Sequence, residues 1–426
     1  MLRKISINIS DNFVLKNVIL LFTGTGISQL IPVVNSLFLA RLYSQEAYGE
    51  QSIFLSIVGI IGAISTLRYE LVIIQAKKEK DARGILLLSL ISVIIISLLS
   101  FCFLYVLKSL VCSNIAISNY SILYWVPLAI LCTGISNCFY NWFSRGRRYK
   151  LITYGLLWQS VSMAVSRLIF GVVGISAGLI YGLILGYLVI TFYYIYSYCH
   201  DNRNWAYMFN SKLTHLKILL KEYKDFAIYS TTSGLFNAMS NIGLPLIISS
   251  FYSTKVAGIY FFANNLVRLP IGLLSQSVSQ VYKKEASILF YHRKVDLYPF
   301  TLKMQKVMLF FVLPILIIFS LFGGLIFSFF FGPSWKESGD MVKYFAVFLF
   351  FNSLYSPISS VMDIMRRQKL LLFFNILLIL SQVIPFVCFY NISFKYVLLL
   401  SSALGGFLFF LLDSYMKNQL KNSIYN

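Results

Sequence analysis

The sequence predicts an all-α polytopic membrane protein, with twelve transmembrane helices in two six-helix lobes. Three observations support this fold class. Of the 426 residues, 58% are hydrophobic and only 12% are charged, whereas ordinary soluble domains are roughly a quarter charged. Long apolar runs recur along the chain, and most lysines and arginines lie between them. A soluble enzyme, a disordered chain and a nucleic-acid binder are therefore poor interpretations, because a soluble chain of this composition would expose large apolar patches.

The apolar runs predict the individual helices. A spanning helix needs about 20 mostly apolar residues, and the run 85–107 meets this with no charge at all. The predicted spans are 17–39, 51–75, 85–107, 120–143, 151–170, 174–198, 226–250, 257–281, 304–330, 341–363, 370–390 and 396–416. A break is needed near Gly171–Gly174, because residues 151–198 are far too many for one span. Runs of this length favour helices over a barrel of short alternating strands.

The distribution of basic residues predicts the orientation. The formal charge is +21, and basic residues hold loops on the cytoplasmic side of a membrane. If both termini are cytoplasmic, 27 of the 36 lysines and arginines fall in inside segments or within three residues of them, six in outside segments or within three residues of them, and three deeper within spans. The first apolar run shows no signal-peptide cleavage site. We therefore expect a multi-pass protein of the cytoplasmic (inner) membrane of a bacterium, with both termini cytoplasmic.

Three short matches indicate that the two halves of the chain are repeats. Tyr43-Ser44 with Gly49 matches Tyr252-Ser253 with Gly258 at an offset of 209 residues. The other matches are Lys77-Lys78-Glu79 with Lys283-Lys284-Glu285 at offset 206, and Arg147-Arg148-Tyr149-Lys150-Leu151 with Arg366-Arg367-Gln368-Lys369-Leu370 at offset 219. Six spans per half give parallel repeats, which typically enclose a central site and rock around it. The alternative is that similar loops converge because both must be basic on the inside.

These repeats predict the domain organisation. The N-terminal lobe comprises 1–200, a cytoplasmic linker 201–225, and the C-terminal lobe 226–426. Within the linker, leucines alternate with lysines over 212–224 at helical spacing, which predicts an interfacial amphipathic helix.

Several of these motifs resemble the O-antigen (Wzx-type) polysaccharide flippases of the multidrug/oligosaccharidyl-lipid/polysaccharide (MOP) exporter superfamily. The resemblance is carried by Leu42-Tyr43-Ser44 with Glu46 and Gly49, by Leu67-Arg68-Tyr69-Glu70, and by the stretch from Leu269-Pro270 through Ser279-Gln280-Val281 to Glu285-Ala286-Ser287. It implies a MATE-like bundle that moves undecaprenyl-pyrophosphate-linked oligosaccharide repeat units between membrane leaflets. It also implies contact with membrane lipids and with the polysaccharide polymerase machinery, and no nucleic acid.

Charged residues inside predicted spans are the candidate substrate-binding residues. Buried charge in a span is costly and is a functional hypothesis by default, and the planar fork of arginine suits a pyrophosphate. Arg268 lies near mid-depth, with Asn264 and Asn265 one turn before it and Pro270 after it. Arg68 and Arg167 are the other candidates. Structural pairing is the alternative for Arg268 and for Arg68, and interfacial snorkelling is the favoured alternative for Arg167.

Two carboxylates are candidates for a gate or for ion coupling. Glu70 lies two residues from Arg68, so on a continuous helix the two would point to different faces and seek partners elsewhere. Asp363 has Arg366 and Arg367 one turn on, and a local ion pair is its favoured alternative. The sequence does not choose between Na⁺, H⁺ and no coupling ion, and it predicts no cofactor.

Two rival functions make different demands on the sequence. A membrane enzyme would need a reacting site, but the chain has no Asp-x-Asp cluster, its three histidines lack metal-ligand spacing, and its outside loops are short. We therefore expect a non-enzyme without a metal site. A MATE-like multidrug or small-molecule exporter remains the alternative, although a lumen for cationic drugs would favour carboxylates over the deep Arg268.

Overall fold

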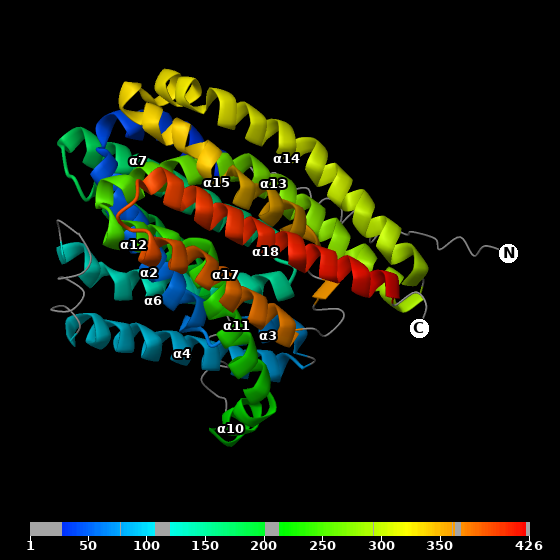
Figure 1. Cartoon of the computed structure of the whole chain (residues 1–426). Coiled ribbons are helices and arrows are strands. Elements are labelled where there is room, and N and C mark those ends of the chain that lie inside the picture. The colour runs from blue at the N-terminus through cyan, green and yellow to red at the C-terminus, as the bar shows by residue number, and fades with distance from the viewer. Residues whose placement is uncertain are drawn as a thin grey trace. The chain divides into compact units, whose positions relative to one another are not determined.

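The computed structural model describes residues 28–76, 78–106, 120–200, 213–292, 294–359, 361–362 and 368–422. Their regular structure is helical throughout (Figure 1). The first half contains the helix Ser28–Leu42, α2 (Gln45–Ser65), α3 (Tyr69–Gln75), α4 (Glu79–Val106), η1 (Tyr120–Trp125), α6 (Val126–Arg145), α7 (Tyr149–Val173) and α8 (Gly178–His200). The second contains α10 (Leu213–Glu222), α11 (Lys224–Ile242), α12 (Leu244–Phe251), α13 (Thr254–His292), α14 (Lys294–Phe331), η2 (Pro333–Trp335), α15 (Lys336–Tyr355), η3 (Ser356–Ile358), α17 (Gln368–Cys388) and α18 (Phe394–Asn422).

The membrane character of the fold is confirmed, but the number twelve is not fully reached. Within the described ranges, ten helices are long and apolar enough to cross a bilayer. The pair α11 and α12, bent by 52°, makes an eleventh if it forms one span. The helix Ser28–Leu42 is shorter and overlaps the first predicted span, whose earlier residues lie outside the described part. Every predicted span therefore overlaps a helix.

The break predicted near Gly171–Gly174 is confirmed. α7 ends at Val173, and Gly174 has a φ of 83°. The Gly174 amide donates to the Gly171 carbonyl, and the Ile175 amide donates to the Phe170 carbonyl. This paired pattern is the Schellman motif, which ends a helix at a left-handed residue, usually glycine.

Two helices extend beyond the ends of their predicted spans. α13 continues from the predicted end at 281 to His292, and α14 begins at Lys294 instead of 304. Both helices have nearly 40 residues, which gives a length of about 60 Å against a hydrocarbon core of about 30 Å. Hydropathy marks where the apolar region ends, whereas the helices continue beyond it. Figure 1 shows them as the two longest ribbons, α14 alongside α15 and α13.

Residue contacts divide the chain into two compact units. The first is drawn from Met1–Leu42, Ile61–Lys108 and Asn119–Thr231, and the second from Tyr43–Ile60, Ser109–Ser118 and Thr232–Asn426, as far as these stretches are described. The beginning of α2 therefore packs with helices of the second half. The lobe boundaries inferred from the repeats stay a prediction.

The linker helix α10 packs on the first unit. Leu216 and Leu219 are buried in its main core cluster, and a Cβ at Gly84 of α4 would lie 2.6 Å from the Leu219 side chain. His215 lies 3.3 Å from Asp81 of α4. The predicted helix is therefore present, and its buried leucines contact protein; whether its exposed face lies at the membrane interface stays a prediction.

Candidate functional site

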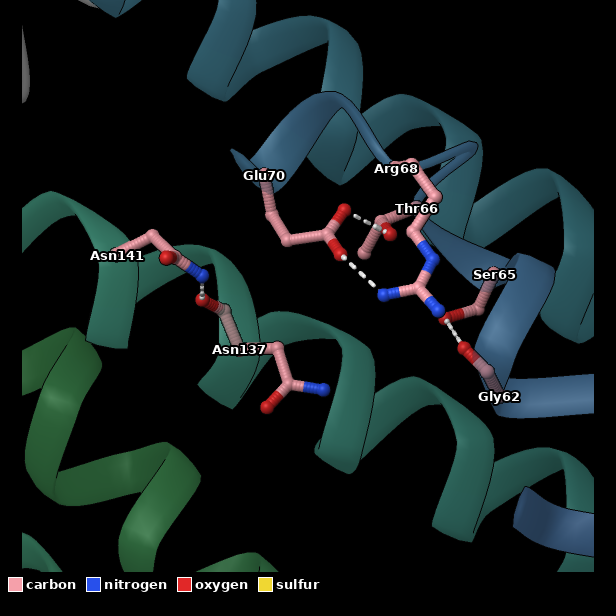
Figure 2. Close-up of polar contacts among 7 residues, drawn as sticks. All are labelled: Gly62, Ser65, Thr66, Arg68, Glu70, Asn137 and Asn141. Atoms are coloured by element: carbon pink, nitrogen blue, oxygen red, sulfur yellow. Dashed lines mark hydrogen bonds and ion pairs between the residues drawn. The ribbon is translucent and has the colours of Figure 1, made fainter. Parts of the chain in front are cut away.

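The first candidate site is a break in the second predicted span. α2 ends at Ser65 and α3 begins at Tyr69, separated by the turn Thr66–Leu67–Arg68 (Figure 2). Leu67 and Arg68 have φ values of 49° and 59°. Non-glycine residues avoid this left-handed region, at a cost of roughly 1–2 kcal/mol each. The expectation of one continuous helix over 51–75 is wrong at these residues.

The offsets between the repeats account for this turn. Before the turn the matching motifs lie 209 residues apart, and after it they lie 206 apart. The first half therefore carries three extra residues between these motifs, and the turn Thr66–Leu67–Arg68 is three residues long. The corresponding helix of the second half, α13, runs without interruption from Thr254 to His292. The turn thus fits a three-residue insertion that loops out instead of shifting the register of the helix.

The turn brings together a charged pair within the second predicted span. Thr66 donates a hydrogen bond from its hydroxyl to the Glu70 carboxylate, and a guanidinium nitrogen of Arg68 lies 4.0 Å from the same carboxylate. Glu70 is buried, whereas 29% of the Arg68 side chain is exposed. The expectation that these two side chains diverge is wrong, because Arg68 lies in a left-handed turn and not in a helix.

Arg68 retains unused donor capacity. Its Nε is buried and has no hydrogen-bond partner among the described residues. Figure 2 shows the neighbouring helix α6 with Asn137 and Asn141, the amide of Asn141 donating to the Asn137 carbonyl at 2.8 Å. The cluster is therefore a polar site at the break between α2 and α3, with a partly exposed cation paired loosely to a buried anion.

The far end of α3 is held by a second arginine. Arg145, at the end of α6, donates to the Ile73 carbonyl at 2.9 Å and to the Ala76 carbonyl. These are carbonyls of the last turn of α3, which lack partners within the helix. Arg145 therefore stabilises a helix end, in addition to contributing to the basic segment 145–150 that is predicted to lie inside.

The second candidate site lies on α13 in the second unit. Arg268 is 14 residues from the start of this helix at Thr254, or about 21 Å along its axis. Asn264 lies one turn earlier, on the same face. The Asn264 Oδ1 and the Arg268 Nε are both buried and lack a hydrogen-bond partner in the described part of the chain. Asn265 is exposed, so the structure places it apart from this pair.

Arg167, by contrast, contacts the neighbouring helix α8. It is buried, with 7% exposure, and its Nε donates to the Leu179 carbonyl of α8 at 2.9 Å. Gly182 of α8 leaves room for its side chain, since a Cβ there would lie 2.5 Å from the Arg167 Cγ. The interpretation that Arg167 snorkels to the interface is therefore wrong: it joins α7 to α8. Its role in substrate binding stays a prediction.

Three other polar residues, Asp363, Gln51 and Asp413, are relevant to the candidate sites above. Asp363 lies outside the described residues, so the structure describes only Glu70 of the two coupling candidates. Sequence reasoning missed Gln51 of α2, which is buried with its Oε1 unpartnered among the described residues. It also missed Asp413 of α18, which accepts from Gln305 and lies 2.6 Å from the Lys417 ammonium. The i, i+4 spacing of Asp413 and Lys417 was the available signal. No group of three metal-ligating side chains occurs in the described ranges.

Comparison with known proteins identifies the family of this chain. A family model described as "Polysaccharide biosynthesis protein" matches residues 38–340. The chain belongs to this family. The matched segment of this polysaccharide biosynthesis protein contains Arg68, Glu70, Arg167, Asn264 and Arg268, and ends before Asp363. No curated protein sequence matches it.

Solved structures show the fold of this family member. It is similar to an inward-facing multidrug resistance MATE family transporter of the MOP superfamily, with 15% identity, a TM-score of 0.70, and coverage of 93% of this chain and 96% of that one. The lipid II flippase MurJ in an inward closed conformation gives 17% identity, a TM-score of 0.69, and coverage of 96% and 88%. A MOP superfamily transporter from Pyrococcus furiosus has 15% identity and a TM-score of 0.56, and the match covers 95% of both chains. At these identities the likeness shows the fold alone.

Proposed function

We propose that this protein is a flippase that moves undecaprenyl-pyrophosphate-linked oligosaccharide repeat units, of O-antigen or a similar surface polysaccharide, across the bacterial cytoplasmic membrane. The proposal rests on one observation, the surroundings of Arg268. Arg268 is a cation deep in a spanning helix, and its Nε and the Asn264 Oδ1 lack partners among the described residues. A polar pair of this kind is costly in a span unless a ligand uses it.

The charge of the site selects the class of substrate. A pyrophosphate needs cationic and N–H donors to cross hydrocarbon, and a guanidinium binds phosphate oxygens with two parallel hydrogen bonds. Arg268 supplies such a group at mid-depth and Arg68 a second, partly exposed one in another span. In this proposal Arg268 and Arg68 each bind the pyrophosphate during its passage. Alternating access moves the headgroup across as the lipid tail stays in the bilayer.

The energy source belongs to the same proposal. Glu70 is the described carboxylate best suited to take up H⁺ or Na⁺, because it is buried and lies beside a cation that can leave it. The product would pass to the polysaccharide polymerase machinery on the outer face. The protein itself makes or breaks no covalent bond in this scheme.

An in-frame deletion in the native host tests the proposal. We expect loss of the surface polysaccharide ladder and accumulation of undecaprenyl-pyrophosphate-linked units facing the cytoplasm. An unchanged ladder with altered tolerance to cationic drugs would instead support the multidrug exporter.

Arg268→Ala is the decisive variant in that strain. Losing a charge-assisted contact of about 1.5–3 kcal/mol should lower the rate of polysaccharide export about 10- to 100-fold. Arg268→Lys should retain part of the activity, since it keeps the charge and loses the planar fork. Lys303→Ala, which removes an exposed cation of α14, is the matched control and should export normally. Equal protein levels in the membrane must be shown by immunoblot, and full export by Arg268→Ala would reject the assignment of this residue.

A further inference from the structure

The break between α2 and α3 is lined by one face of α6. Gly134 of α6 lies against the end of α2, because a Cβ on Gly134 would lie 3.2 Å from the Ser65 hydroxyl oxygen. Arg145 lies about three helical turns later on the same face and binds carbonyl groups of α3. Asn137 and Asn141 are three and seven residues after Gly134, so they lie on this face between the two contacts. These residues all belong to the first compact unit.

The side-chain amides of Asn137 and Asn141 are only partly used by the protein itself. Asn141 donates one N–H to the Asn137 carbonyl at 2.8 Å, within its own helix (Figure 2). Asn137 is exposed, and its side-chain amide has no hydrogen-bond partner among the described residues. Each amide carries two N–H donors and an acceptor oxygen. The pair therefore offers free donors and acceptors one helical turn apart, with no net charge.

The depth of this pair indicates that it does not face lipid. Asn137 lies six residues from the inner end of the predicted span 120–143, or about 9 Å along the helix. Arg68 lies at a similar depth, seven residues from the inner end of the predicted span 51–75. Polar side chains within spans almost always face the interior of a bundle or a water-filled path. An exposed, neutral amide pair thus lies at the depth of Arg68, on the helix that lines its turn.

We propose that Asn137 and Asn141 bind hydroxyl groups of the sugar that is attached directly to the pyrophosphate, and that they select the substrate by this sugar. The inference rests on the proposed function and names the part of the substrate that this pair binds. A sugar hydroxyl both donates and accepts hydrogen bonds, and a neutral amide can meet it in both ways without competing with Arg68 for the phosphate oxygens. When Arg68 binds the pyrophosphate, the first sugar is the one within reach of α6. A site built to bind a substrate hydroxyl discriminates strongly against a ligand that lacks it.

Equilibrium binding to the purified full-length protein in detergent tests this assignment. The two probes are undecaprenyl pyrophosphate and the same lipid carrying only its first sugar, extracted from a host mutant that is blocked after the first glycosyl transfer. We expect wild-type protein to bind the one-sugar lipid about tenfold more tightly than undecaprenyl pyrophosphate, which is the effect of one or two hydrogen bonds. Asn137→Ala and Asn141→Ala should each lower this ratio severalfold, whereas Arg68→Ala should weaken the binding of both lipids alike.

Thr133→Ala, one turn before Asn137 on α6, is the matched control. The Thr133 hydroxyl donates to the Ala129 carbonyl of its own helix at 2.8 Å, so its removal should leave the ratio unchanged. Asn137→Gln keeps the amide and should retain part of the preference. Equal melting temperatures of the variants and wild type show that the fold is intact.

The outcomes separate this inference from the proposed function. If Asn137→Ala and Asn141→Ala keep the full ratio, or if wild-type protein does not distinguish the two lipids, the inference is overturned while the proposed function stands. Wild-type protein that binds neither lipid would reject the proposed function, and this inference with it.

Discussion

At the scale of single residues, the arginines in and beside the predicted spans differ in what they contact. Arg167 is buried against α8 and donates to a backbone carbonyl there, and Arg145 binds carbonyls at the end of α3. Arg68 and Arg268 each keep a buried Nε without a partner among the described residues. The sequence identified all three in-span arginines, but only the structure shows that Arg167 joins α7 to α8.

The pairing of Arg68 with Glu70 can be measured by a double-mutant cycle. Arg68→Ala, Glu70→Gln and the double variant should show a coupling of about 1 kcal/mol in the free energy of unfolding, within the usual range for residues in contact. The partial exposure of Arg68 keeps the coupling below that of a fully buried pair. Thermal unfolding in detergent measures it. The exposed pair of Arg83 and Glu79 is the control and should give about 0.3–0.5 kcal/mol. Additive effects of Arg68→Ala and Glu70→Gln would show that the pair does not interact.

At the scale of helices, two chain breaks illustrate what sequence can and cannot predict. The break at Gly174 was predictable, because a long apolar run must divide and glycine readily takes the left-handed conformation. The break at Thr66–Arg68 was not, because neither Leu67 nor Arg68 is a turn-forming residue type. Its available signal was the change in repeat offset from 209 to 206.

Substitutions at these two breaks should have opposite effects on stability. Gly174→Ala places a Cβ at a φ of 83° and should destabilise the protein by about 1 kcal/mol, since nothing lies within 4 Å to add a steric cost. Leu67→Gly relieves the strain at a φ of 49° and should stabilise it by about 0.5 kcal/mol, after the entropy cost of glycine. Melting temperatures in detergent decide both. A destabilising Leu67→Gly would mean that the side chain of Leu67 contributes packing that outweighs the strain.

At the scale of the whole molecule, the constraint that makes spans predictable also limits the prediction. A helix that crosses the hydrocarbon needs about 20 apolar residues, and every predicted span therefore overlaps a helix. This requirement does not apply to residues beyond the bilayer, and the sequence therefore did not predict the extension of α13 and α14. Long-range contacts such as the crossing of α2 with α13 left only a weak trace, the paired glycines at offset 209. The sequence could predict which residue types occupy the site, but not how they are arranged in space.

The orientation of the whole chain is a prediction that reporter fusions decide. With 27 basic residues assigned to the inside and six to the outside, the positive-inside rule places both termini and the linker 201–225 in the cytoplasm. A fluorescent protein that matures only in the cytoplasm should be bright when fused after residue 426 or inserted in the linker. Alkaline phosphatase, active only outside, should be active when fused after Ser393, between α17 and α18, and inactive after residue 426. Activity at both positions would mean that the number of spans between them is even, and the predicted arrangement of twelve would then have to be revised.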